Sequence, residues 1–162
     1  MNAIELLIDQ HRLLEARLKA AVDATHPHAR RALLEQIGDH LAVHIASEEE
    51  VFYPAVKARR TADILLESLE EHLSLKRLLA DLLELSPSAP TFGAKLKVLK
   101  EQTEHHHREE EEHLFPKVRM LWDPQQLDVL GQQMMRLQQD LRDEGEPREA
   151  LTEQTDEAAR LQ

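Results

Sequence analysis

Two segments of this chain, 62 residues apart, repeat one arrangement of histidine and glutamate. Residues 44–54 read HIASEEEVFYP, and residues 106–116 read HHREEEEHLFP. In both segments the first histidine precedes a glutamate by four residues; the two pairs are His44 with Glu48 and His106 with Glu110. On a helix this spacing places an imidazole and a carboxylate one turn apart on the same face. Two such faces can supply the ligands of a metal site.

A single histidine stands upstream of each segment. His11, in DQHRLL, and His72, in EEHLSL, lie 61 residues apart, and each precedes the first histidine of its segment by 33 or 34 residues. The repeating unit is therefore a pair of helices that carries one histidine and then a histidine with a glutamate. Used twice, this unit gives six candidate metal ligands: His11, His44, Glu48, His72, His106 and Glu110.

The apolar residues around these ligands recur with the period of an α-helix, and each ligand occupies a core position of its stripe. The four stripes are Ile4–Val22, Leu33–Ala55, Leu65–Leu82 and Leu96–Lys117. Short polar or proline-containing connections separate them at residues 25–28, 59–61 and 86–90. Connections of this length suit antiparallel neighbours, so residues 1–122 are predicted to form an up-down-up-down four-helix bundle. Pro54 and Pro116 should kink or end the second and fourth helices.

The composition supports an all-α fold. Leu, Ala, Glu, Gln, Lys and Arg are abundant, whereas there are only four Gly and five aromatic residues. Straight-chain residues lose little rotamer freedom in a helix, which favours helix over sheet. A length of 162 residues suits one domain with a single core.

Beyond the bundle, Asp123 and Pro124 are typical of a helix start, and residues 123–143 are predicted to form an additional C-terminal helix. Its apolar stripe could pack on the outside of the bundle or form a homo-oligomer through this fifth helix. Its members are Leu127, Leu130, Met134, Leu137 and Leu141. Residues 144–162 are charged and weakly patterned, so we expect a flexible tail there.

The formal net charge of −11 makes nucleic acid and anionic membranes poor partners, because both carry negative charge. No cysteine is present, so a metal ion would have nitrogen and oxygen ligands only. The first residues lack a basic region followed by an apolar run, and no stretch approaches the roughly 18 apolar residues of a transmembrane helix. We therefore expect a cytoplasmic protein.

Six polar groups at core positions would be costly to bury without partners. A buried hydrogen-bonded network of histidine and glutamate that holds the helices in register is one explanation. The other is a metal centre, because imidazole and carboxylate suit iron, manganese or zinc. Two carboxylates from opposite helices can each bridge two ions, so the number of ligands favours a dinuclear site.

The repeated motif, a histidine followed by His-x-x-x-Glu-Glu-x-x-Leu-Phe-Pro, resembles that of hemerythrin-like (HHE cation-binding) domains and covers about residues 1–122. The resemblance implies a non-haem di-iron centre, oxo- or hydroxo-bridged, that binds, senses or processes oxygen, peroxide or nitric oxide. It also implies that the four histidines are terminal iron ligands, with Glu48 and Glu110 as the bridges.

Oxygen-carrying hemerythrins have a fifth histidine one turn before the ligand of the third helix, where this chain has Ser68. By the resemblance, each iron would then keep an open position, which suits peroxide or nitric oxide chemistry more than oxygen carriage. Di-iron proteins of iron–sulfur cluster repair share four histidines and two glutamates, but they carry a cysteine-bearing N-terminal domain that this chain lacks. No catalytic acid or base can be named, so a non-enzymatic iron-sensing or iron-buffering module is the alternative.

Several further side chains lie near the stripes. Glu15 follows His11 by four residues but is predicted to lie on the flank of its helix, and His113 is a candidate extra ligand or outer hydrogen-bond donor. His40 lies on the flank of the second stripe. The other histidines are expected at the surface: His26, His28, His105 and His107.

Glu49 and Glu111 match the second glutamate of the family motif and could support the ligands, whereas packing accounts for Tyr53 and Phe115.

Overall fold

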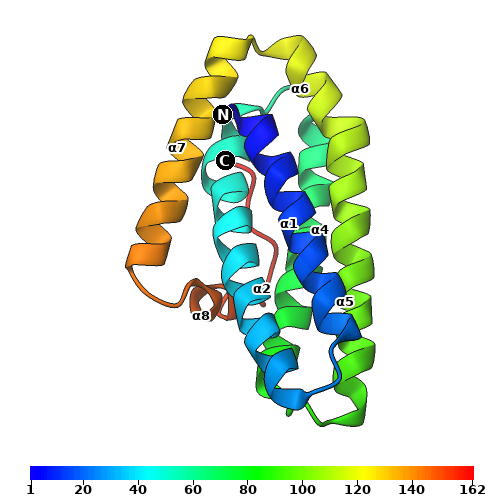
Figure 1. Ribbon diagram of the computed structural model, residues 1–162. Helices are drawn as coiled ribbons and strands as arrows, with labels where there is room; N and C mark the ends of the chain where they lie inside the picture. The colour runs from blue at the N-terminus through cyan, green and yellow to red at the C-terminus, as the bar shows by residue number, and fades with distance from the viewer.

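The computed structural model describes all residues, 1–162, and every regular element in it is a helix. In chain order these are α1 (Ala3–Asp23), α2 (Pro27–Ser47), the π-helical η1 (Glu48–Phe52), α3 (Tyr53–Ala55), α4 (Ala62–Glu84), α5 (Pro90–Glu109), the π-helical η2 (Glu110–Leu114), α6 (Phe115–Leu121), α7 (Pro124–Asp143) and α8 (Pro147–Thr152). Four antiparallel rods form the bundle: α1, α2 with η1 and α3, α4, and α5 with η2 and α6 (Figure 1). The predicted all-α, up-down-up-down bundle is confirmed. None of the helices has the length and apolar character required of a membrane span.

The interior of the bundle consists of two apolar clusters. One lies at the end where the chain begins and includes Ile4, Leu7, Phe52 and Phe115. The other lies toward the opposite end and includes Leu14, Leu41, Leu79 and Leu96. The six candidate ligands are buried and fall between these clusters along their helices. The predicted apolar stripes therefore supply a core above and below a polar layer.

The two π-helical segments begin at the two glutamates of the repeated motif. The N–H of Tyr53 donates to the carbonyl of Glu48, and that of Phe115 donates to the carbonyl of Glu110, so both bonds span five residues. A proline follows each segment and has no N–H to donate. The wider turn accommodates this break locally, and such turns often occur at functional sites. The rod ends at Ala55 after the first proline, whereas α6 continues to Leu121 after the second.

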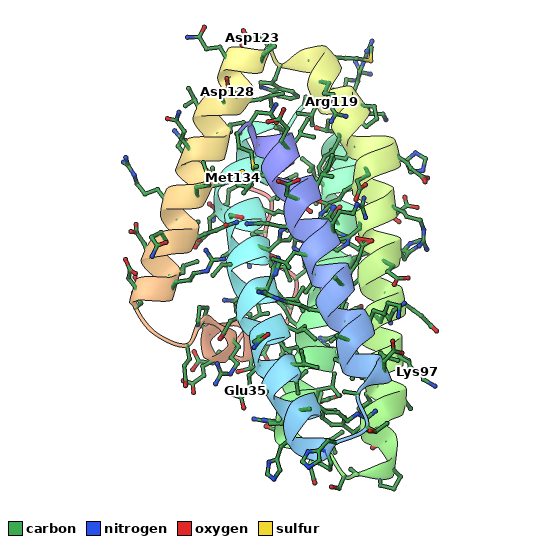
Figure 2. The ribbon with its side chains drawn as sticks, viewed as in Figure 1. Glu35, Lys97, Arg119, Asp123, Asp128 and Met134 are labelled. Atoms are coloured by element: carbon green, nitrogen blue, oxygen red, sulfur yellow. The ribbon has the colours of Figure 1, made fainter.

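The predicted fifth helix is α7, and it packs on α1 and α2 of the same chain. Asp123 caps it, accepting from the N–H of Gln126 at 2.8 Å (Figure 2). Met134 is fully buried between α7 and the bundle (Figure 2). Leu127 and Leu130 are buried beside it. Of the two alternatives for this stripe, packing on the outside of the bundle is therefore the one observed, and a homo-oligomer through the partly exposed Leu137 and Leu141 stays a prediction.

Gly131 lets α7 approach the start of the chain, and we predict that Gly131→Ala destabilises the fold. A Cβ at this position would lie 2.8 Å from the carbonyl carbon of Asn2 and 2.9 Å from the nitrogen of Ala3. Backbone atoms cannot rotate away, so the helix has to shift, at a cost of about 1–3 kcal/mol in the free energy of unfolding measured in urea. Gly93→Ala is the control, since its Cβ would meet only the mobile guanidinium of Arg30. Equal stability of the two variants would contradict the close approach of α7.

The C-terminal segment forms α8 and docks on the bundle in place of the expected flexible tail. Leu151 of α8 is buried in the apolar cluster of α2 and α4. Arg148 donates to both carboxylate oxygens of Asp39 at 3.0 and 3.2 Å. The last residues return toward the start of the chain (Figure 1), and Arg77 holds them by donating to the carbonyl of Thr155 at 2.9 Å. The contacts that dock this segment come from residues scattered along it, among them Arg148, Leu151 and Leu161, so they give no helical period in the sequence.

Candidate metal centre

The structure brings all six predicted ligands together in the polar layer of the bundle. Each is at most 2% exposed. They come from all four rods: His11 from α1, His44 from α2, Glu48 from η1, His72 from α4, His106 from α5 and Glu110 from η2. Positions that are far apart in the sequence meet because antiparallel packing brings the middle of every rod to the same level.

Each glutamate contacts histidines of two different rods. Glu48 Oε1 lies 3.3 Å from both His44 Nε2 and His72 Nε2. Glu110 Oε1 lies 3.1 Å from His11 Nε2 and 3.4 Å from His106 Nε2. The rings of His11 and His44 lie 5.1 Å apart, and Nε2 of His72 lies 3.1 Å from Nε2 of His106, so the ligands divide into a first half with His11 and His44 and a second half with His72 and His106. Both carboxylates touch both halves, which is the arrangement that two bridging carboxylates require.

Several ligand atoms in this layer have no hydrogen-bond partner despite being buried. They are His11 Nε2, His44 Nε2, both carboxylate oxygens of Glu48 and Glu110 Oε1. The short distances between them lack hydrogen-bond alignment, so the atoms face a common space instead of each other. Leaving one such group unpaired costs about 1–3 kcal/mol, and a hydrogen-bonded network would have satisfied them. A cation bound by nitrogen and oxygen fits this set of donors.

The other ring nitrogen of each ligand histidine is held by an outer partner. Nδ1 of His11, His72 and His106 lies 2.8, 2.9 and 2.7 Å from a carboxylate oxygen, and Nδ1 of His44 lies 2.8 Å from an amide oxygen. The partners are Glu111, Glu49, Glu71 and Gln10, in the same order. Because each partner oxygen accepts a hydrogen bond, the proton of the ring lies on Nδ1. The Nε2 lone pair therefore remains available for a metal ion. Glu49 and Glu111 confirm the prediction of supporting glutamates.

Gln10 and Glu71 were not identified from the sequence. Each directly precedes a ligand histidine, so the helical period alone points it away from the ligand's stripe. Gln10 nevertheless contacts His44, and Glu71 contacts His106, because these partners lie on neighbouring rods. A polar residue immediately before each single histidine is the signal that could have indicated them.

His107 is buried, so the prediction that it lies at the surface is wrong. It is 2% exposed, and its ring stacks on that of His11 with centroids 3.7 Å apart. Successive residues on a helix point about 100° apart, but α5 packs against both α1 and α4. His106 therefore faces α4 and His107 faces α1. Only His105 of this run is exposed.

Tyr53 takes part in the site as well as in the packing. Its hydroxyl donates to Glu110 Oε2 at 2.8 Å and lies 3.4 Å from His72 Nε2. Burial, followed by the charges of Glu110 and Glu48, raises the pKa of Tyr53 well above its ordinary value. The phenol consequently keeps its proton and remains a hydrogen-bond donor beside the second half of the site. Phe115 is a packing residue, as predicted, in the apolar cluster.

The two candidate extra ligands lie outside the layer. Glu15 is on the flank of α1, as predicted, where it accepts from Arg12 and lies 3.2 Å from His107 Nδ1. The side chain of His113 is 56% exposed and turns toward Glu109, so His113 is not a ligand. The wide turn of η2 changes the helical register after Glu110, which rotates position 113 outward.

The ionisable groups of the layer perturb one another. Burial disfavours charge on His11 and His72, but neighbouring carboxylates outweigh it and raise both pKa values to about 9. Burial and the charge of Glu48 raise the pKa of Glu110. Burial lowers the pKa of His107 well below its ordinary value, with the nearby histidines adding to the effect. In the metal-free protein, protons on His11 and His72 therefore supply part of the positive charge that the carboxylates need.

We predict that the metal-free protein loses stability as the pH rises from 6.5 to about 9. His11 and His72 have folded pKa values above the ordinary 6.5. Their contribution is thus complete below pH 6.5 and disappears as the pH passes through the folded pKa. The free energy of unfolding should fall by an amount on the order of a few kcal/mol. For chelated protein, the melting temperature at pH 9 should therefore be lower than that at pH 6.5 by about 5–10 °C. Metal-loaded protein should show a smaller change, and a constant melting temperature for the chelated protein would contradict the proton's role.

The comparisons with known proteins agree with the helical fold. The family model described as the hemerythrin HHE cation binding domain matches residues 2–118. The crystal structure of a hemerythrin HHE cation binding domain-containing protein from Mycobacterium kansasii superposes with a TM-score of 0.81 at 23% identity. That match covers 94% of this chain and 98% of the other, and it supports the fold. A protein named DNA nickase from Nostoc sp. is 29% identical over 119 residues, which are 74% of this chain and 34% of that protein.

Proposed function

Because this chain belongs to the hemerythrin HHE cation-binding family, we propose that it holds two iron ions between the four rods and uses them to bind, sense or process oxygen, peroxide or nitric oxide. The unpaired, buried nitrogen and oxygen atoms that face one space carry this proposal. His11 and His44 would hold the first ion, and His72 and His106 the second. Glu48 and Glu110 would bridge the two ions.

Bound iron would supply electrons and open coordination positions for a small oxygen or nitrogen ligand. The chain's own residues would orient the imidazoles through their outer partners and keep bulk water from the layer. Tyr53 would hold the bridging Glu110 by donating to its Oε2 at 2.8 Å, with the phenol oxygen 3.4 Å from His72 Nε2 at the second half of the site. Manganese or zinc would suit the same nitrogen and oxygen donors.

The test is metal analysis of protein purified without added metal, joined to an anaerobic optical spectrum before and after oxygen. Two irons per chain and a spectrum that changes on oxygen exposure are expected. Substoichiometric protein should then convert hydrogen peroxide to oxygen and water over many turnovers. Zinc alone, with no spectral change after reconstitution with ferrous iron, would remove the redox function.

A hydrogen-bonded connection between α7 and the site favours a second candidate, a non-enzymatic iron-sensing or iron-buffering module. Gln138 of α7 donates to Gln10 Oε1 at 3.1 Å and to Ser47 Oγ at 2.9 Å. Gln10 Oε1 in turn accepts from His44, and the hydroxyl of Ser47 donates to the carbonyl of His44 at 2.8 Å. Metal binding at His44 would thus change the environment of α7.

Hydrogen exchange separates the sensor from the enzyme. For a sensor, iron loading should slow exchange across α7 in the wild-type protein, without peroxide turnover. Gln138→Leu should remove that protection in α7 but leave it in α4, because the glutamine forms its hydrogen bonds with Gln10 and Ser47 of α1 and α2. Equal protection of α7 in both proteins would count against signalling through this helix.

DNA cleavage is not part of the proposal. The matched region is about a third of the nickase, and a chain with a net charge of −11 repels a polyanion.

A further inference from the structure

We propose that residues 153–162, named here the strap, cover the outer partner of His72 and thereby strengthen the hold on the second ion. This inference rests on the proposed dinuclear site. It gives a role to the part of the chain that follows α8, which lies outside the repeated motif. Release of the strap would weaken metal binding at one half of the site and leave the other half unchanged.

The strap is attached to the bundle at two places. Arg77 of α4 donates from Nε to the carbonyl of Thr155 at 2.9 Å and from Nη2 to the carbonyl of Asp156 at 3.0 Å. Farther along, Leu161 is partly buried against the apolar cluster at the end where the chain begins. The strap therefore follows the outside of the bundle from α8 back toward the first residues (Figure 1).

Between these two attachments the strap lies over Lys76. A cavity of about 450 Å³ is lined by Lys76 and otherwise by residues of the strap, yet the lysine is only 1% exposed. Three acidic residues of the strap line the same cavity and place negative charge near the ammonium; they are Glu153, Asp156 and Glu157. A segment without helical structure thus separates this lysine from bulk water.

Lys76 connects the strap to the metal centre through Glu49. Its ammonium donates to Glu49 Oε1 at 3.0 Å, and Glu49 Oε2 lies 2.9 Å from His72 Nδ1. Away from water these charged hydrogen bonds are stronger than they would be in solvent. If the strap opens, water competes for the carboxylate of Glu49, and the ring of His72 is held less firmly in the orientation that a metal ion requires.

The equivalent pair in the other half of the repeat has no such cover. Glu111 occupies the place of Glu49 and supports His11, but the side chain of its cation, Arg12, is 54% exposed. The side chain of Glu111 is itself 21% exposed, whereas that of Glu49 is 9% exposed. Of these two glutamates only Glu49 is kept from solvent, so the strap acts on the second ion and not on the first.

A coupling between the strap and the second ion has to act in both directions. We expect the closed strap to strengthen binding of this ion by about 10-fold, the lower end of the effect of an outer partner. Binding of the ion then opposes opening of the strap by the same factor. Lys76 reports the opening, because an acylating reagent reaches its amine only when the strap is displaced.

The test is the rate at which an N-hydroxysuccinimide ester acetylates Lys76, measured by mass spectrometry with the 72% exposed Lys19 as internal reference. Anaerobic loading of the wild-type protein with ferrous iron should slow this labelling by about 10-fold. Arg77→Ala and Leu161→Asp should speed it in metal-free protein. Both variants should also lower the affinity for one of the two ions by about 10-fold in a chelator competition. Arg136→Ala, at an exposed arginine of α7, should behave as the wild type.

Leu96→Ala distinguishes release of the strap from a general loss of stability, since it removes fully buried packing contributed by α5. Equal labelling of Lys76 in Leu96→Ala and Leu161→Asp would show that the whole chain opens, and would overturn the proposal. Faster labelling in the strap variants with wild-type affinity for both ions would overturn it too, while the dinuclear site stands. A wild-type protein that binds fewer than two irons would remove both proposals.

Discussion

Glu48→Ala is expected to lose both metal ions. Glu48 Oε1 lies 3.3 Å from a histidine of each half of the site, so its removal takes a ligand from both positions at once. We expect the affinity for each ion to fall by at least about 100-fold, the upper end of the effect of removing an outer partner. Metal per chain, measured after desalting of anaerobically loaded protein, should drop from two to near zero.

Glu50→Ala is the matched control for this loss, because Glu50 is exposed two residues farther along the same segment. It should keep two ions. Glu110→Ala should reproduce the loss, since Glu110 also contacts both halves. Retention of one tightly bound ion by both Glu48→Ala and Glu110→Ala would show that the carboxylates do not bridge and would contradict the dinuclear arrangement.

Glu49→Ala is expected to reduce both metal affinity and stability. Glu49 Oε2 lies 2.9 Å from His72 Nδ1, and Oε1 accepts from Lys76 at 3.0 Å. Lys76 is only 1% exposed, so the variant leaves a buried ammonium without its partner. Removing one member of a buried ion pair costs about 3–5 kcal/mol, and removing the partner of a ligand histidine weakens metal binding about 10–100-fold. Urea unfolding of metal-free protein and chelator competition measure the two effects.

Two further variants separate these effects. Glu49→Ala combined with Lys76→Met removes both charges and should recover most of the stability but not the metal affinity. Glu111→Ala removes the corresponding partner of His11. The other contact of Glu111 is Arg12, whose side chain is 54% exposed. It should weaken metal binding with little loss of stability, because an exposed arginine remains solvated. If Glu111→Ala destabilises the fold as much as Glu49→Ala, the explanation by a buried lysine is wrong.

Equivalent positions of the repeated motif therefore have different surroundings in the two halves of the chain. Glu49 and Glu111 occupy the same place in the repeat, but one pairs with a buried lysine and the other with an exposed arginine. Tyr53 reaches Glu110 across the bundle, whereas Phe115, its counterpart in the repeat, has no polar atom. Each of these differences places additional polar groups near His72. The two halves are thus related in ligand type but not in surroundings.

The sequence by itself determined the helical fold, the order of the rods and the six groups of the polar layer. Helical periodicity states which residues share a face, and a bundle buries that face, so polar residues within an apolar stripe must meet inside. Both the His-x-x-x-Glu spacing and the stripe that contains His11 are local properties, readable from neighbouring residues. The capped start of α7 at Asp123 is local in the same way.

Only the tertiary structure decided what lies around those six groups. His107 is inside because α5 contacts two rods, and His113 is outside because a π-helical turn interrupts the regular period. Gln10 and Glu71 act on ligands of other rods, and α8 docks through Arg148 on α2. Each depends on the distance and rotation between helices, which arise from packing of the whole chain and leave no periodic pattern in any one segment.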